Sequence, residues 1–522
     1  MGNFGYHRLR RAPLQFSGTV PYLIAGSAAS LLYIQGTADP GALRAAGLAL
    51  VLQILTWTLA MALLAKRSGN FIRISDPGVL VLAMAALYLI YPSVVWTKTQ
   101  TLAGVSITHE TASLLFHLHS LYIIAFTAGY ICIAPRWRDQ LTLDLRHLPS
   151  GRSWLLIPAG ILFVSIAIRL AGGGGVFPTT NYASNWYDLQ AGILASRSRG
   201  GLGYILTQIN SKTSFYSLVI QGVAGGLMLT RAIALHKRTY RTLFLLAALA
   251  AAVVLFGDGG RGPGVIIMII TLVFADLAIG PIPLKLVAPV ILAGMFGFML
   301  LGYYRTVRDL GVVEAARVSY QRFGEHTESD NAGEFTSMLP KEALVLELFE
   351  GAPKEGFQYL WTNVLMLVPS QLVPQKLQWS STAAVLSRRM LGPSAAAMGA
   401  GAAGTTIGDG YKFAGVAGVP ILACLLGAIM GTVHRWLFGR KAHGSNLTFL
   451  KAILVSGFYG FAFKILRDEL GATFVYAFYG IVVPYFFLTF VIRCPRAWIA
   501  PSRERGRSVM APGISARLAG RA

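Results

Sequence analysis

The sequence predicts an all-α membrane protein with about twelve transmembrane helices and a large, partly helical loop on the outer face. Of its 522 residues, 54% are apolar and only 13% are charged, which lies outside the range of soluble domains. Apolar stretches of about 20 residues, the length that crosses hydrocarbon as a helix, recur along the chain. No stretch alternates as the strands of a membrane barrel would, so every span should be α-helical.

We expect the spans at residues 16–36, 42–65, 77–96, 111–134, 153–171, 203–230, 240–257, 263–281, 284–304, 413–438, 446–466 and 471–492. The first follows Arg8, Arg10 and Arg11, as in a signal peptide, but it runs on past the small residues Ser27-Ala28-Ala29. We therefore interpret it as an uncleaved signal anchor.

The distribution of charge predicts a cytoplasmic N-terminus and a cytoplasmic C-terminus. With this threading the inner side carries 26 of the 45 Lys and Arg residues but only 5 of the 22 acidic residues, as the positive-inside rule requires. The net charge of +23 then reflects topology and contact with lipid headgroups rather than binding of nucleic acid. The three cysteines lie within or beside spans, so no disulfide framework is expected.

The connections divide the chain into four parts. Residues 1–304 hold the first nine spans and an outer loop at 172–202, and residues 305–412 form a loop far longer than an ordinary connector. This loop is not expected to be disordered, because 341–350 has helical composition and 357–368 is an apolar run too short to span, typical of an interfacial or re-entrant helix. Residues 413–492 hold the last three spans, and the basic segment 493–522 is expected to be a disordered cytoplasmic tail.

Two outer segments carry side chains suited to sugars and anions. In the loop 172–202, Asn185 and Trp186 could bind a glycan through amide hydrogen bonds and ring stacking, or they could belong to an interfacial aromatic belt. In the hairpin Phe256-Gly-Asp-Gly-Gly-Arg261-Gly-Pro263, glycines allow close approach of a ligand and the guanidinium can bind phosphate bidentately. The alternative is that Asp258 simply pairs with Arg261.

The start of the long loop adds further candidates. Arg305 and Arg308 share one helical face and could complete a pyrophosphate site, or they could snorkel at a helix end. Arg322, Glu325 and His326 follow; Glu325 or His326 could act as a general base, although a mixed charge run is usually a solvated loop.

A histidine-rich group opens the fourth span. His109, Glu110, His117 and His119 lack the i, i+4 spacing of a zinc-binding helix, so hydrogen-bonded membrane histidines are the favoured interpretation. There is no Asp-x-Asp pair on the outer side, and we expect neither a divalent metal nor another cofactor.

The end of the long loop carries two further motifs. Pro369-Ser-Gln-Leu-Val-Pro374-Gln-Lys376 is followed by Thr405-Thr-Ile-Gly-Asp409-Gly-Tyr411-Lys-Phe-Ala-Gly415, a glycine-rich entry to the tenth span. Asp409 could serve a reaction or cap a helix. The glycines at 415, 418, 427 and 431 could permit close helix packing.

Taken in order, these motifs resemble those of bacterial oligosaccharide repeat-unit polymerases, the O-antigen polymerase or Wzy class, which is related to the O-antigen ligases. The resemblance implies a GT-C-like membrane fold in the bacterial inner membrane and an active site facing the periplasm. It implies that Arg261, with Arg305 and Arg308, holds a pyrophosphate, and it leaves the general base unassigned. Together with the candidates taken from the residues themselves, the predicted catalytic residues are Arg261, Arg305, Asp409, Glu325 and His326, and the predicted substrate-binding residues are Arg308, Arg322, Tyr411, Lys376, Trp186 and Asn185. The family often has Glu where this chain has Asp409.

The implied reaction transfers a glycan from undecaprenyl pyrophosphate to another lipid-linked unit. The implied partners are the undecaprenyl-pyrophosphate-linked glycan donor and acceptor, the lipid bilayer, a flippase and a chain-length regulator. Two other functions stay open: ligation of a finished glycan, and transport of lipid-linked sugars. Carriers usually have two repeated halves and ionisable residues near mid-membrane, whereas the charges here gather at the outer rim.

Overall fold

The computed structural model describes residues 43–68, 72–102, 105–135, 337–352, 354–368, 382–391, 404–438 and 449–482, with ten single positions elsewhere. Within these ranges the protein is almost entirely helical, and four helical segments are long and apolar enough to cross a membrane: Ala45–Arg67, Pro77–Thr99, His109–Ile133 and Thr406–Phe438. These four coincide with the predicted spans at 42–65, 77–96, 111–134 and 413–438 apart from shifts at their ends. The other predicted spans lie wholly or partly outside the described residues.

The first described helices form a meander. Helix α2 (Leu43–Arg67) is followed by a span built from α3 (Pro77–Ala85), a π-helical segment η2 (Ala86–Ile90) and α4 (Tyr91–Thr99). Asp76 caps α3 by accepting from the Gly78 amide at 2.9 Å, and Pro77 occupies the first turn, where its missing N–H is not needed. The span ends at Gln100, whose φ of 56° turns the chain into a hairpin.

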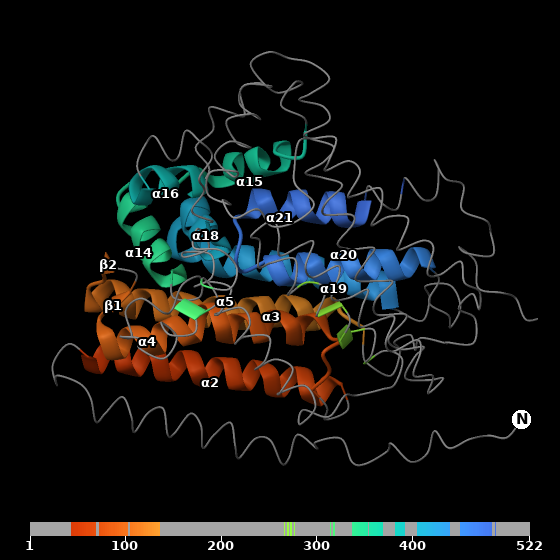
Figure 1. Cartoon of the computed structure of the whole chain (residues 1–522), viewed down its shortest axis with the longest axis horizontal. Helices are drawn as coiled ribbons and strands as arrows, with labels where there is room; N and C mark the ends of the chain where they lie inside the picture. Colours follow the sequence, from red (N-terminus) through yellow and green to blue (C-terminus); the bar gives the residue numbers. More distant parts are fainter. Residues whose placement is uncertain are drawn as a thin grey trace, which may run out of the picture.

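That hairpin marks one end of the bundle. Strand β1 (Thr101–Leu102) pairs antiparallel with β2 (Val105–Ser106), and Thr108 then caps α5 (His109–Ile133). Three shorter helices gather around this end and along the side of the bundle: α14 (Met338–Phe349), α15 (Gly356–Leu365) and α16 (Thr382–Leu391). In Figure 1, α14, α16 and α18 (Thr406–Ala414) cluster beside the hairpin, and we call this region the hairpin end.

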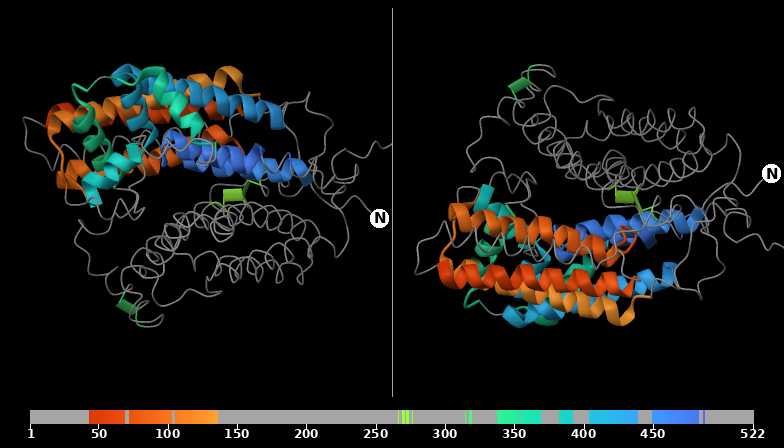
Figure 2. Two further views of the ribbon diagram at one scale, coloured as in Figure 1. Left: turned by 90° about the horizontal axis from the view of Figure 1, so that it is seen from above. Right: turned by 90° about the horizontal axis from the view of Figure 1, so that it is seen from below.

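The C-terminal helices complete the bundle. Helix α18 leads through a 3-10 turn η7 (Gly415–Ala417) into α19 (Gly418–Phe438), and α20 (Phe449–Lys464), α21 (Leu470–Ala477) and η8 (Phe478–Val482) follow. Helix α5 packs between α2 and α19, and α20 lies next to α3 and α21 (Figure 2). The chain reverses between α18 and α19 at Gly415, whose φ of 65° favours glycine.

Glycines allow α5 and α19 to approach closely. A Cβ on Gly427 would collide with the Phe126 carbonyl, one on Gly129 with the Cys424 carbonyl, and one on Gly431 would lie 3.0 Å from the Tyr130 carbonyl oxygen. The expectation that Gly427 and Gly431 serve close helix packing is therefore confirmed, because small residues bring two backbones together. On the outside of the bundle, α2 exposes a stripe of leucines suited to lipid: Leu48, Leu52, Leu55, Leu59 and Leu63.

The end opposite the hairpin is closed by buried polar groups. The Tyr130 hydroxyl donates to Asp76 at 2.7 Å and lies 2.5 Å from His434 Nδ1. A tyrosine carries a single proton, so His434 must present an N–H at Nδ1. Arg67 donates to the carbonyls of Ile131 and Pro135 and so completes the last turn of α5. These bonds fix the positions of α2, α3, α5 and α19 relative to one another along the bundle axis.

Candidate functional site

Asp409 is the most highly connected acidic residue at the hairpin end. It lies in the first turn of α18, with no exposed surface. Its Oδ1 accepts from the Tyr359 hydroxyl at 2.5 Å and from the Thr382 hydroxyl at 2.9 Å, and its Oδ2 accepts from the Leu470 amide. One carboxylate therefore joins α15, α16, α18 and the first turn of α21.

Asp409 caps a helix, as one of the two interpretations from the sequence predicted, but the helix is α21 and not α18. Thr405 caps α18 itself, because its hydroxyl accepts from the Gly408 amide at 3.0 Å. Asp409 instead satisfies the free amide of Leu470 at the start of α21, where a negative charge also interacts favourably with the helix dipole. The sequence could not reveal this, since the two residues are 61 positions apart.

Tyr359 keeps its proton within this cluster. Burial, and then the neighbouring carboxylate of Asp409, raise its pKa well above the ordinary value for a phenol. The hydroxyl is therefore a permanent donor to Asp409, and it also lies 3.0 Å from the Thr382 hydroxyl. Neither Tyr359 nor Thr382 was among the candidates taken from the sequence, because a lone tyrosine in an apolar run carries no local signal.

The glycines of this motif bring backbones together. A Cβ on Gly410 would lie 2.7 Å from the Cα of Val419, and one on Gly418 would meet the Gly410 carbonyl. On the other side, a Cβ on Gly408 would lie 3.3 Å from a methyl of Val345 on α14. The Gly-Asp-Gly sequence thus allows α18 to fit between α14 and the start of α19.

Lysine and tyrosine side chains lie next to this corner. Lys412 is buried and pairs with the half-exposed Glu355, with 3.1 Å between Nζ and Oε1. Tyr411 is partly exposed, and the ammonium of the exposed Lys354 lies 4.4 Å from its ring centroid. Because of this exposure, Tyr411 can contact a ligand and Asp409 cannot.

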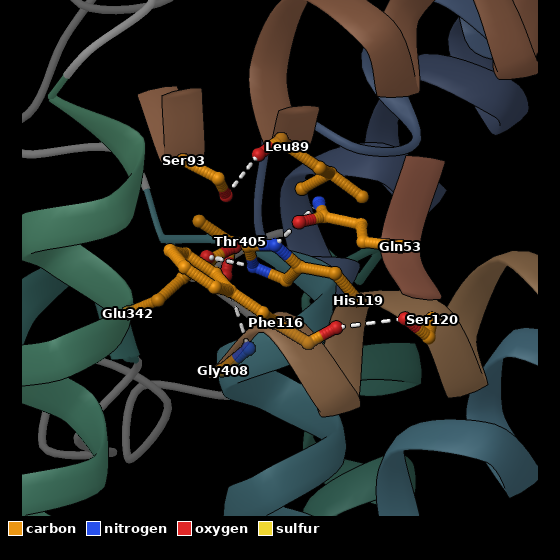
Figure 3. Close-up of polar contacts among 9 residues, drawn as sticks. All are labelled: Gln53, Leu89, Ser93, Phe116, His119, Ser120, Glu342, Thr405 and Gly408. Carbon is orange, nitrogen blue, oxygen red and sulfur yellow. Dashed lines mark hydrogen bonds and ion pairs between the residues drawn. The ribbon is translucent and has the colours of Figure 1, made fainter. Parts of the chain in front are cut away.

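A second buried cluster joins the spans to α14. His119 of α5 lies between Gln53 of α2, at 3.0 Å from Nδ1, and Glu342 of α14, at 2.7 Å from Nε2 (Figure 3). All three side chains are buried, and within the part of the chain that the structure describes Glu342 Oε1 and Gln53 Oε1 have no hydrogen-bond partner. The expectation of a hydrogen-bonded membrane histidine is confirmed for His119.

The tautomer of His119 follows from its neighbours. The amide nitrogen of Gln53 is the atom that faces Nδ1, and it can only donate. The ring proton of His119 must therefore be on Nε2, from which it is donated to Glu342. The pair therefore docks α14 on the membrane helices through a charge-assisted hydrogen bond. Glu342 was missed by the sequence analysis, although an acid on the apolar face formed by Leu339, Val345 and Leu346 is a usable signal.

The two clusters belong to one end of the molecule. Helix α14 carries Glu342 and also packs on α18 through Val345 and Gly408, and the Thr406 hydroxyl reaches the Tyr122 hydroxyl at 3.4 Å. Among the described residues no three His, Cys, Asp or Glu side chains come together as a metal site. Among the described residues, the exposed cations at the hairpin end include Lys98, Lys354, Arg388 and Arg389, and they could attract an anion.

Most of the predicted site residues fall elsewhere. The candidates outside the described residues are Asn185, Trp186, Arg261, Arg305, Arg308, Arg322, Glu325, His326 and Lys376. Of the predicted site residues, only Asp409 and Tyr411 lie within the described ranges, four and six positions after the cap residue Thr405. No protein-family profile, curated protein or solved structure matches this chain.

Proposed function

We propose that this protein is a glycosyltransferase of the bacterial inner membrane that polymerises undecaprenyl-pyrophosphate-linked repeat units at the periplasmic face. The product would be a surface polysaccharide such as O-antigen, capsule or exopolysaccharide. The proposal starts from the ordered motifs of the sequence, from the Arg261 hairpin to the Asp409 turn.

The observation that best supports the proposal is the position of Asp409. A polymerase must hold two large lipid-linked substrates over its membrane helices, and this requires a folded segment rather than a free loop. Asp409 links two helices of the 305–412 segment, α15 and α16, to the start of α21. Transport of a substrate across the membrane does not require such a fixed junction of α15, α16, α18 and α21 at one end of the bundle.

In the proposed reaction Arg261, with Arg305 and Arg308, binds the pyrophosphate and stabilises the charge that develops as it leaves. Glu325 or His326 receives the proton of the acceptor hydroxyl. Asp409 positions α18, so that Tyr411 on the same helix can contact the substrate; its burial favours this indirect role over direct chemistry. Arg322, Lys376, Trp186 and Asn185 contribute glycan and phosphate contacts.

The test is incubation of the purified protein in nanodiscs with an undecaprenyl-pyrophosphate-linked repeat unit, followed by gel electrophoresis. A ladder of products is expected, and Arg261→Ala should slow its formation by about 10²–10³-fold, as the loss of one preorganised charge does elsewhere. Arg317→Ala is the matched control, because Arg317 is exposed and meets only Glu314 at 3.7 Å among the described residues.

The other outcomes are equally informative. A single transferred product would indicate a ligase. Absence of any product, together with movement of the lipid-linked sugar across a vesicle membrane, would indicate a transporter. An undiminished ladder from folded Arg261→Ala would remove Arg261 from the mechanism.

A further inference from the structure

Helix α15 has its polar side turned inward and its apolar side outward. The two residues that it buries are Tyr359 and Asn363, both polar. Its opposite face is formed by Phe357, Trp361 and Val364, which are 82%, 62% and 39% exposed. The spacing of four and then three residues places these three side chains on one stripe.

The neighbouring helices α14 and α16 have the opposite arrangement. Helix α14 buries Leu339 and Leu346 and exposes the acidic Glu347. Helix α16 buries Leu386 and exposes Arg388 and Arg389 on its last turn. These two helices are built for water on the outside, so the inverted pattern belongs to α15 and is not a general property of this part of the chain.

The place of α15 in the fold agrees with its inverted pattern. It packs on α18 at the hairpin end and on α21 along the side of the bundle (Figure 1). Its buried face is fixed there, because Tyr359 bonds to Asp409 and a Cβ on Gly471 of α21 would lie 2.7 Å from Asn363 Oδ1. The ring of Phe357 meets Phe413 of α18 edge-on, with 5.8 Å between the ring centroids, but the stripe otherwise points away from the helices on which α15 packs.

The residues around the N-terminus of α15 are of the types found at a membrane interface. Lys354 is exposed just before the helix, and its ammonium lies above the ring of Tyr411. Lysine, tyrosine and tryptophan are the residues that settle at headgroup level, whereas phenylalanine and valine favour the hydrocarbon below it. Interfacial helices combine such a polar edge with an apolar face.

We propose that the stripe Phe357–Trp361–Val364 is immersed in the phospholipid acyl chains of the membrane leaflet nearest the hairpin end. Helix α15 is thus a membrane-contacting helix that does not span. Its inward hydroxyl group joins it to Asp409, so the lipid contact and the glycine-rich corner of α18 are parts of one rigid unit. This inference concerns the surface alone and does not depend on the proposed activity.

The experiment is collision spin labelling of the full chain in nanodiscs of phosphatidylethanolamine and phosphatidylglycerol. A nitroxide is attached to Trp361→Cys in a background from which the native cysteines have been removed: Cys132, Cys424 and Cys494. Leu55→Cys on α2, 52% exposed on the leucine stripe, is the lipid reference, and Glu347→Cys on α14 is the water reference. Oxygen partitions into lipid, while a water-soluble nickel chelate does not.

The expected ratio of oxygen to nickel collisions at position 361 is close to that at position 55 and several-fold above that at position 347. A ratio equal to that at position 347 would overturn the proposal, as would a label that neither reagent reaches, which would indicate a covering protein surface. Immobilisation of the label by added undecaprenyl pyrophosphate alone would assign the stripe to a polyprenyl chain and also overturn it. Phe357→Cys repeats the measurement if Trp361→Cys does not fold.

Discussion

Removal of the Asp409 carboxylate should loosen the corner where α15, α16, α18 and α21 meet. Asp409→Ala strands three donors, the hydroxyls of Tyr359 and Thr382 and the Leu470 amide. The two hydroxyls lie 3.0 Å apart, so in the variant one of them can donate to the other. The remaining hydroxyl and the Leu470 amide are then two donors without an acceptor. At about 1–3 kcal/mol for each stranded buried group, the expected loss is about 2–6 kcal/mol.

The assay is thermal unfolding of the protein in nanodiscs, followed by tryptophan fluorescence. For a chain longer than 250 residues each kcal/mol corresponds to roughly 2 °C or less, so a drop of several degrees in Tm is expected for Asp409→Ala. Glu347→Ala, which removes an exposed acid from α14, should leave Tm unchanged.

A double-mutant cycle isolates the contribution of the Tyr359 hydroxyl. Tyr359→Phe alone removes one donor, and in an Asp409→Ala background it should cost much less, because its acceptor has gone. Since burial and Asp409 raise the pKa of Tyr359, the coupling should persist from neutral pH to pH 10 rather than fade as the phenol ionises. If Asp409→Ala is as stable as Glu347→Ala, or the two changes are additive, the corner is not held as described.

Two further predictions concern contacts between distant segments. Glu342→Ala leaves the Nε2–H of His119 without its acceptor and should cost about 1–3 kcal/mol, whereas Glu342→Gln keeps an acceptor and should recover at least half. Equal losses for the two variants, measured by urea or thermal unfolding, would contradict this, because a neutral acceptor would then fail to replace the carboxylate. Gly427→Ala should destabilise the protein by about 1–3 kcal/mol by forcing α5 and α19 apart. Gly460→Ala on α20, where the nearest atom is 3.9 Å from the added Cβ, should be neutral or stabilising by up to about 1 kcal/mol, and the same effect at both positions would contradict the packing argument.

The spans were predictable because hydrocarbon imposes one length on every crossing helix. The apolar stretches at 42–65 and 111–134 correspond to α2 and α5 with small shifts at the ends. The short helices α14 and α15 were also predicted, from helical composition at 341–350 and from an apolar run at 357–368. Both signals are local, so one sequence was enough.

Elements decided by neighbouring segments were not predicted. The tenth span was expected to start at 413, but a separate short helix, α18, already begins at Thr406. The chain turns at Gly415 between α18 and α19, and the close packing of Gly410 on Val419 stabilises this turn. The glycine-rich turn drew attention to Asp409, yet nothing local pointed to Tyr359 as its partner. Specific polar contacts depend on which helices meet, and a single sequence does not encode this in any short pattern.

The polar contacts within the bundle also set an order of events during synthesis. The Tyr130 hydroxyl can bond to His434 only after 304 further residues have been synthesised, and His119 can bond to Glu342 only after 223 further residues. At about 5–20 residues per second, the first gap corresponds to roughly 15–60 s of translation. During that time Tyr130 lacks His434 and Gly129 lacks its contact with α19, while His119 can pair with Gln53 of the earlier helix α2 but not yet with Glu342. The early insertion of α5 therefore depends on its leucine, isoleucine and phenylalanine side chains rather than on its contacts with α14 and α19.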